Sequence, residues 1–233
     1  MTDTPQNRRP LKVRAAAWPR ALAARLAAAN VSPDTISAAG VAFAALGGAL
    51  LMLSGLLEPA GRAAALIVAA LCIQLRLVCN LLDGLVAVEH GKGGPAGPIW
   101  NELPDRVADV LFLVGAGYGA RALGLHGAEV AGWIAAVLAV TTAYVRELGR
   151  GLGQPADFSG PMAKPQRMAA LTVACVISAF EPLWGGEGQV MVVALALIAV
   201  GTLVTVARRT RRLAVWLGDL DPSLIERGRG PPP

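Results

Sequence analysis

The chain has 233 residues, of which 55% are hydrophobic and only 16% are charged, and its mean hydropathy is +0.53. An ordinary soluble domain has about 25% charged residues, so this composition excludes that class and indicates an integral membrane protein. The formal net charge of +5 is explained by Lys and Arg that contact anionic lipid headgroups, and no nucleic-acid partner is needed.

The first predicted element is an amphipathic helix near residues 18–29, which follows a polar and basic N-terminus. Pro19 is in its first turn, and Arg20 and Arg25 are available to its polar side. We expect this helix to lie along the membrane surface, within a cytoplasmic N-terminal segment of residues 1–30. Ser32-Pro33-Asp34 then begins a new helix, because a hydroxyl N-cap is followed by proline and by an acid that the helix dipole favours.

Six apolar stretches are long enough to cross a hydrocarbon core of about 30 Å. They are predicted near residues 36–56, 63–88, 105–123, 130–148, 168–184 and 190–207. Basic residues gather before the first, between the fourth and fifth, and after the sixth stretch, so both termini should face the cytoplasm. The predicted fold is all-α: six transmembrane helices over residues 31–212 and a cytoplasmic tail of residues 213–233, in the inner membrane.

The second and third spans meet at a short loop, where acidic and amide side chains recur at one-turn spacing. Residues three and four apart share one face of a helix. One such stripe contains Asn80, Asp83, Gly84 and Ala87, and the other contains Asn101, Asp105 and Asp109. Oxygen ligands of this kind suit Mg²⁺ or Mn²⁺, and ionisable groups beside hydrocarbon are costly and usually functional. The sequence therefore predicts a divalent-metal site at the cytoplasmic end.

Several neighbouring residues are interpreted around this site. Gly84, Ala87 and Gly97 leave room for a ligand to approach. Arg76, one turn before Asn80, should neutralise the carboxylates or a bound phosphate, and snorkelling is the alternative. Asp109 is either a metal contact, a partner of Arg106 or a residue behind the site. Pro104 is tolerated if its helix begins near Asn101.

This pattern resembles the motif of the CDP-alcohol phosphotransferase family, D-x-x-D-G-x-x-A-R-x8-G-x-x-x-D-x-x-x-D. Laid on without gaps, the motif falls in order on Asn80, Asp83, Gly84, Ala87, Val88, Gly97, Asn101 and Asp105. Residues 32–37 resemble the family's start of the first span. Asn replaces two of the four Asp and Val88 replaces the Arg, so the chain is identified as an atypical branch. A rival alignment with a one-turn insertion puts the last two Asp on Asp105 and Asp109.

The resemblance implies a membrane enzyme that moves a phosphatidyl or phospho-alcohol group from a CDP-linked donor, with CDP-diacylglycerol expected, and releases CMP. The acceptor would be a small alcohol or an alcohol phosphate. One or two Mg²⁺ or Mn²⁺ ions would be held by Asn80, Asp83, Asn101 and Asp105, with Asp105 or Asp109 as the catalytic carboxylate. Arg146, Lys164 and Arg167 resemble basic elements of the phosphatidylglycerophosphate-synthase branch and should bind phosphate, unless they are topology signals only.

Two other functions are compatible with the sequence. A catalytically silent relative that binds lipid or nucleotide would retain the fold after losing two aspartates. A small transporter ranks lower, because the polar groups cluster at one face instead of lining a path across the membrane. Membrane lipids are expected partners in each case, and a homodimer is left open.

Overall fold

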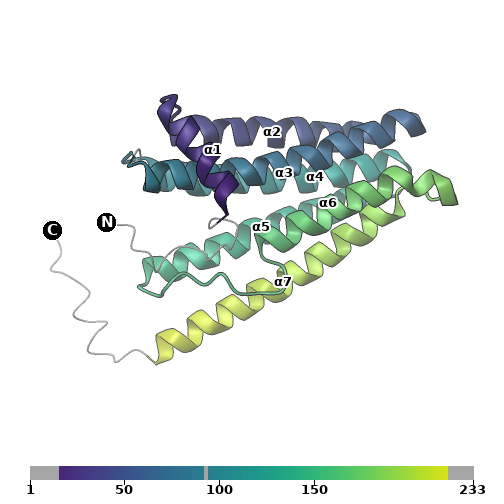
Figure 1. Cartoon of the computed structure of the whole chain (residues 1–233). Coiled ribbons are helices and arrows are strands. Elements are labelled where there is room, and N and C mark those ends of the chain that lie inside the picture. Colours follow the sequence, from purple (N-terminus) through teal and green to yellow (C-terminus); the bar gives the residue numbers. More distant parts are fainter. Residues whose placement is uncertain (1–15, 92–93, 220–233) are drawn as a thin grey trace.

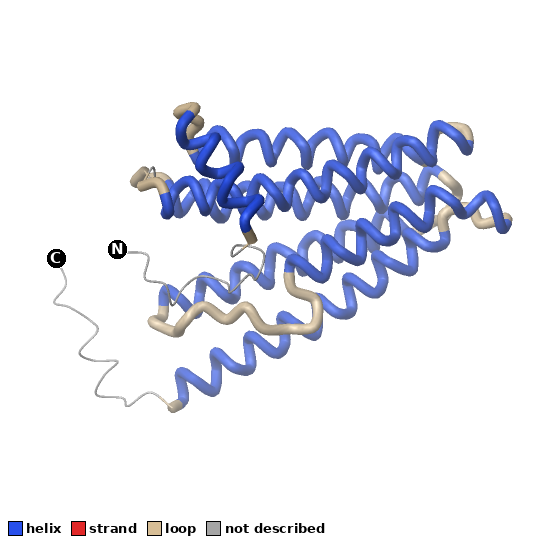
Figure 2. Tube along the Cα trace, in the orientation of Figure 1, coloured by secondary structure: helices blue, strands red, loops and turns tan. Residues whose placement is uncertain are grey.

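The computed structural model describes residues 16–91 and 94–219, and within these ranges every regular element is helical (Figures 1 and 2). The all-α prediction is therefore confirmed. The helices are α1 (Ala17–Ala28), α2 (Pro33–Ser54), α3 (Pro59–Glu89), α4 (Gly97–Ala122), α5 (Ala128–Gly151), α6 (Lys164–Phe180), the 3-10 helix η3 (Glu181–Trp184) and α7 (Gln189–Gly218).

The six long helices form a closed bundle. In contact order around the bundle, α2 packs on α3, α3 on α6, α6 on α7, α7 on α5, α5 on α4, and α4 on α2 again. Successive long helices run in alternate directions (Figure 1). The end of α3, the start of α4 and the ends of α5 and α7 therefore lie at one end of the bundle, where α1 also crosses α3.

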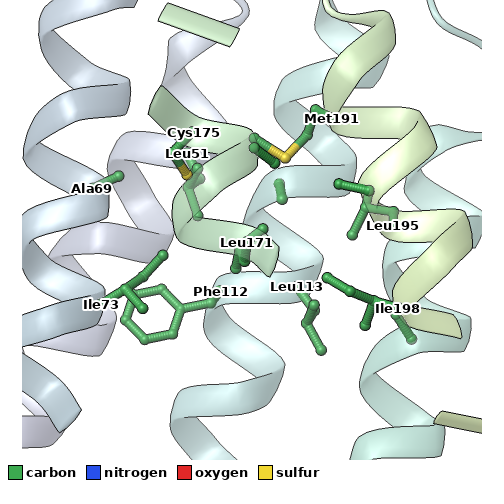
Figure 3. Close-up of a cluster of buried hydrophobic side chains, with 14 of the residues drawn as sticks. Leu51, Ala69, Ile73, Phe112, Leu113, Leu171, Cys175, Met191, Leu195 and Ile198 are labelled. Atoms are coloured by element: carbon green, nitrogen blue, oxygen red, sulfur yellow. The ribbon is translucent and has the colours of Figure 1, made fainter. Parts of the chain in front are cut away.

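The core is apolar and draws on all six long helices. Phe112 of α4 packs beside Ile73 of α3, and Leu171 of α6 lies between them and Leu195 of α7 (Figure 3). All four side chains are fully buried. This core fixes the middle of the bundle, so the polar residues near its end are held by rigid helices.

Small residues let neighbouring helices approach closely. A Cβ on Gly115 of α4 would collide with the carbonyl oxygen of Gly48 on α2, and a Cβ on Gly117 would lie 2.7 Å from the oxygen of Ala128 on α5. Backbone contact through glycine is a common way for helices to associate in membranes, where exclusion from water does not drive them together.

Five helical segments are long and apolar enough to cross a membrane among the residues described: Pro33–Ser54, Pro59–Glu89, Ala128–Gly151, Lys164–Trp184 and Gln189–Gly218. The third predicted span, residues 105–123, corresponds to α4, which carries several charges in its first half and is not among these five. Its buried residues, including Asp109 and Phe112, lie inside the bundle. Hydropathy alone therefore supports five spans.

The start of α4 differs from the prediction. The helix begins at Gly97, one turn before Asn101, because Pro98 occupies its first turn and the Ala96 carbonyl accepts from the amides of Ile99 and Trp100 at 3.0 and 3.1 Å. Pro104 is consequently inside the helix, and the expected start near Asn101 was wrong.

Near the ends of the chain the structure describes the start of α2, the packing of α1 and the end of α7. The Ser32 hydroxyl caps α2 by accepting from the Thr35 amide at 3.1 Å, as expected. Ala23 and Ala27 of α1 are buried against the last turns of α3. Helix α7 continues to Gly218, past the predicted start of the tail, and residues 220–233 lie outside the described ranges.

Candidate active site

The two predicted stripes meet at the end of the bundle. The Asn80 side-chain amide of α3 donates to both carboxylate oxygens of Asp105 on α4, at 3.0 and 3.3 Å. Both helices present these residues on the inner face because they recur at one-turn spacing. The carboxylate and carboxamide groups thus converge from two segments separated by a loop.

Asp105 lies among cations. Its carboxylate forms ion pairs with Arg76 of α3 and Lys164 of α6, and Arg106 of α4 lies 4.0 Å away. The Asp105 side chain is 13% exposed, so these contacts are only weakly screened by water. Asp105 is therefore held as a carboxylate with its charge already compensated.

Asp83 has the opposite surroundings. It is buried, and its Oδ2 accepts a hydrogen bond of 2.7 Å from the hydroxyl of Ser37 on α2. Its Oδ1 is buried without a hydrogen-bond partner, and no cation among the described residues forms an ion pair with it. A buried carboxylate oxygen without a partner is costly. Asp109 also has such an oxygen, but Asp109 is ion-paired, so Asp83 is the carboxylate of this site that a bound cation would compensate.

Asp109 lies one turn deeper than Asp105. It is fully buried and pairs with Arg167 of α6 at 2.7 Å, while Arg167 also donates to the Met162 carbonyl at 3.1 Å. The alternative partner considered for Asp109, Arg106, instead pairs with Glu102. Asp109 therefore forms a buried ion pair, with Arg167 as its partner.

The outermost layer of the site is also paired. Arg146 of α5 forms ion pairs with Glu102 of α4 and with its neighbour Glu147, and its guanidinium lies 5.3 Å from the ring centroid of Phe158. Asn101 is exposed, and its amide lies 3.4 Å from Glu102. Asn101 lies one turn before Asp105 on α4, but no hydrogen bond of the described residues joins it to the other predicted metal ligands.

The glycines of the motif face open space. A Cβ built on Gly84 or Gly97 would meet no atom within 4 Å among the described residues. Packing therefore does not require glycine at either position. The half-buried Ala87 lies one turn beyond Asp83 on the same helix. These small residues are consistent with room for a ligand beside Asp83.

The loop between α5 and α6 borders the basic residues of the site and was not predicted from the sequence. Residues 152–163 run back along the bundle before α6 begins (Figure 2). Arg209 of α7, interpreted only as part of a basic cluster, donates to the carbonyls of Ser159 and Thr142 at 2.9 Å each. The Thr205 hydroxyl accepts from the Met162 amide at 3.0 Å. Arg209 is buried, and this burial, which distinguishes it from an ordinary surface arginine, cannot be read from composition.

Asp157 fastens the same loop. Burial raises its pKa, but the hydrogen bonds from Ser159 and the charges of Arg212 and Arg209 outweigh that effect and hold the pKa below its usual value. Asp157 is therefore charged at neutral pH and lies 3.6 Å from Arg212 of α7.

Ser37 is a second residue of the site that was not predicted, although the sequence around it indicated a functional segment. It lies in the segment of residues 32–37 that resembles the family's start of the first span, but no role was given to it. The other missed contact, Glu102 with Arg106 and Arg146, joins α4 to α5.

The residues of this site suit one divalent cation, although they do not form a cluster of acidic side chains among the described residues. No three His, Cys, Asp or Glu side chains in the described part of the chain form a metal-binding group. The unpartnered oxygen of Asp83 remains, and Asn80, which carries a carboxamide oxygen, lies three residues before it on the same helix face.

Comparison with family models gave no match. Two curated proteins are similar along most of the chain. The phosphatidylinositol phosphate synthase of Mycobacteroides abscessus is 28% identical over 203 residues, which cover 86% of this chain and 85% of that protein. The enzyme of the same name from Mycolicibacterium smegmatis is 26% identical over 208 residues, covering 87% and 86%.

Solved structures show the same fold. Phosphatidylinositol phosphate synthase PgsA1 of Mycobacterium tuberculosis with CDP-DAG bound matches with a TM-score of 0.69 and 20% identity, over 85% of this chain and 94% of that chain. The same protein in complex with manganese and citrate matches with a TM-score of 0.68 and 20% identity, over 84% and 88%.

Proposed function

We propose that this chain, which belongs to the CDP-alcohol phosphotransferase family, transfers the phosphatidyl group of CDP-diacylglycerol to the hydroxyl of an alcohol phosphate and releases CMP. One observation supports this most directly. Two motif carboxylates, Asp83 and Asp105, lie at the same end of the bundle as Lys164, Arg146 and Arg167. A site for joining two phosphate-bearing substrates needs both kinds of group.

The donor's pyrophosphate would lie beside Asp83 and Gly84. A divalent ion held there by Asp83 and Asn80 would stabilise the negative charge that develops on the leaving CMP. The related PgsA1 has been solved in complex with manganese, which makes Mn²⁺ or Mg²⁺ the first ions to test. The open space at Gly84 would admit a phosphate close to the backbone of α3.

Asp105 would orient the acceptor. Its pairing with Arg76 and Lys164 keeps it ionised, so it can accept the hydrogen bond of the attacking hydroxyl. The hydroxyl oxygen forms a bond to the phosphorus that carries diacylglycerol, and the pyrophosphate bond to CMP breaks. The hydroxyl proton passes to Asp105 and then to water. Asp109 would support this step indirectly, because its ion pair fixes the position of Arg167.

An anionic acceptor is favoured by the basic side chains beside Asp105. The ion and Arg76 would face the donor's pyrophosphate, whereas Lys164, Arg146 and Arg167, which pair with Asp105, Glu102 and Asp109 here, would turn toward a second phosphate when it binds. Inositol phosphate is the first candidate, because both curated relatives are named phosphatidylinositol phosphate synthase.

We infer a six-span arrangement for the chain, with α4 as the span whose polar face is buried in the bundle. The site, both termini and the surface helix α1 would face the cytoplasm by the positive-inside rule, in the inner membrane. Membrane lipids would then surround the exposed apolar faces of the helices. A homodimer is compatible with those faces.

The decisive experiment measures CMP release. Purified protein in lipid nanodiscs receives CDP-diacylglycerol and Mn²⁺ or Mg²⁺, with inositol phosphate, glycerol phosphate or free inositol as acceptor. Release that requires both a divalent ion and an acceptor, and that Asp83→Asn abolishes, supports the proposal. CMP release that is unchanged in Asp83→Asn would contradict it.

One observation favours a second function, that of a relative that binds without turnover. Asn80 and Asn101 replace two motif acids, and Asp105 is already paired with two cations. Such a protein would retain CDP-diacylglycerol in a binding assay but release no CMP with any acceptor.

A further inference from the structure

We propose that Arg76 takes the place of one of the two divalent ions that the four-aspartate motif would bind, so that this site holds a single ion, at Asp83. This inference rests on the proposed function, because it assigns the charges that would face the donor's pyrophosphate. It concerns how many ions bind, which can be measured without turnover.

Arg76 is built into the site. Its side chain is 3% exposed and its Nη2 pairs with Asp105. Snorkelling, the alternative interpretation, requires the charged tip to reach water, and this burial rules it out. The Nε and Nη1 atoms are buried without hydrogen-bond partners among the described residues. These two buried donors are therefore unsatisfied among the described residues, and a phosphate oxygen that reached them would supply the missing partner.

Helix α2 leaves space for this guanidinium. A Cβ at Gly40 would lie 3.2 Å from Cδ and 3.4 Å from Nη1 of Arg76, which is closer than most Cβ contacts. A larger residue at Gly40 would have to displace the arginine. The buried position of Arg76 thus depends on a small residue of a different helix.

The charges of the site support one ion. Four aspartates would offer four negative charges, but Asn80 and Asn101 are neutral. Asp105 is compensated by Arg76 and Lys164, so bringing a second divalent ion to Asp105 would place it against two cations. Asp83 and Asp109 each retain a buried oxygen without a hydrogen-bond partner, but Asp109 is paired with Arg167, whereas no cation of the described residues forms an ion pair with Asp83. One ion at Asp83 and the guanidinium of Arg76 would then share the two charges of a pyrophosphate.

The test counts ions. Full-length protein in nanodiscs is titrated with Mn²⁺, and electron paramagnetic resonance measures the free ion and any coupling between bound ions. The wild type should saturate near one Mn²⁺ per chain without spin coupling. The triple variant Arg76→Met, Asn80→Asp, Asn101→Asp should bind about two ions, with the broadened spectrum of a coupled pair.

The matched control is the double variant Arg62→Met, Glu181→Gln. It removes another buried arginine of α3 together with its partner, which lie 2.8 Å apart next to η3, away from the site. This control should still bind one ion. Thermal unfolding checks that each variant is folded.

The wild type decides the question even if the triple variant does not fold. Two coupled ions in the wild type, or none at millimolar Mn²⁺, would overturn the inference, and so would a folded triple variant that still binds one ion. CMP release is measured on the same samples. One bound ion without acceptor-dependent CMP release would refute the proposed function but leave the role of Arg76 intact.

Discussion

At the scale of residues, two aspartates of one motif have different tasks because their neighbours differ. Asp105 is surrounded by Arg76, Lys164 and Asn80, whereas Asp83 receives one hydrogen bond from Ser37. A carboxylate next to two cations remains charged but is a poor ligand for a third. A buried carboxylate with an open oxygen attracts one.

The contact from Ser37 leads to a graded prediction. Asp83→Asn removes the ligand and should lower kcat by at least about 100-fold, whereas Ser37→Ala removes only the hydrogen bond that orients it and should lower kcat about 10-fold, with weaker Mn²⁺ binding. CMP release and Mn²⁺ titration measure both effects. Glu58→Gln, at the distant start of α3, is the control. Equal losses in Ser37→Ala and Glu58→Gln would argue against the assignment.

Lys164 should act on the acceptor. Losing one charge-assisted phosphate contact of roughly 1.5 to 3 kcal/mol corresponds to about a 10- to 150-fold change in affinity. We therefore expect Lys164→Met to raise the acceptor KM by about that factor, and the donor KM far less.

Steady-state kinetics with each substrate varied in turn measures the Lys164 effect. Arg150→Ala is the matched control, because Arg150 is a more exposed cation that pairs with Glu147 on its own helix, at 2.9 Å. Unchanged acceptor kinetics in Lys164→Met would make a neutral alcohol the better acceptor, and Lys164 a topology signal.

At the scale of elements, glycines decide how closely the helices pack. Gly115→Ala should destabilise the bundle by about 1 to 3 kcal/mol, because the new methyl group collides with the backbone of α2, which cannot move as a side chain can. Gly61→Ala on α3 meets only Leu57, at 3.5 Å, and should be neutral or slightly stabilising. Thermal unfolding in detergent compares the two. Equal melting temperatures would contradict the close packing of α2 on α4.

The loop of residues 152–163 should loosen when its anchor on α7 is removed. Thr205→Val retains the shape of a buried side chain but leaves the Met162 amide without its acceptor, at a cost of about 1 to 3 kcal/mol. Hydrogen exchange in the loop should become about 5- to 150-fold faster. Thr141→Val is the control, since its hydroxyl bonds only within α5 at 2.8 Å. No difference between the two variants would show that the anchor is unimportant.

At the scale of the whole molecule, the alternating directions of the helices place the start of α4 and the ends of α3, α5 and α7 together (Figure 1). The site is formed there by α2, α3, α4, α5 and α6, so it depends on the whole bundle. Its most buried ion pairs join different helices, as with Asp105 of α4 and Lys164 of α6 or Asp109 of α4 and Arg167 of α6.

Six spans would place Pro233 in the cytoplasm and Gly185, between η3 and α7, on the opposite side. Reporter fusions at these two positions should therefore give opposite signals, with a fusion near Arg121 to Glu129 agreeing with Gly185. If α4 did not span, the crossings between the N-terminus and Gly185 would fall from five to four, so an N-terminal reporter and one at Gly185 would lie on the same side. Reporters on the same side at Pro233 and Gly185 would overturn the topology.

The sequence by itself determined the all-α fold, the cap at Ser32 and the convergence of Asn80 with Asp105, because apolar runs, capping residues and one-turn spacing act over short distances along the chain. It could not determine where α4 begins, which acid Arg167 holds or whether Asn101 reaches the site.

Those features were decided only by the tertiary structure. The partner of a buried charge is set by which helices pack together, and residues as distant in sequence as Ser37 and Asp83, or Thr142 and Arg209, meet only in the closed bundle. The same packing turned Arg76 from an apparent membrane-edge arginine into a buried partner of Asp105. Spacing along one helix shows which face a side chain occupies, but the neighbouring helix decides which charge it meets.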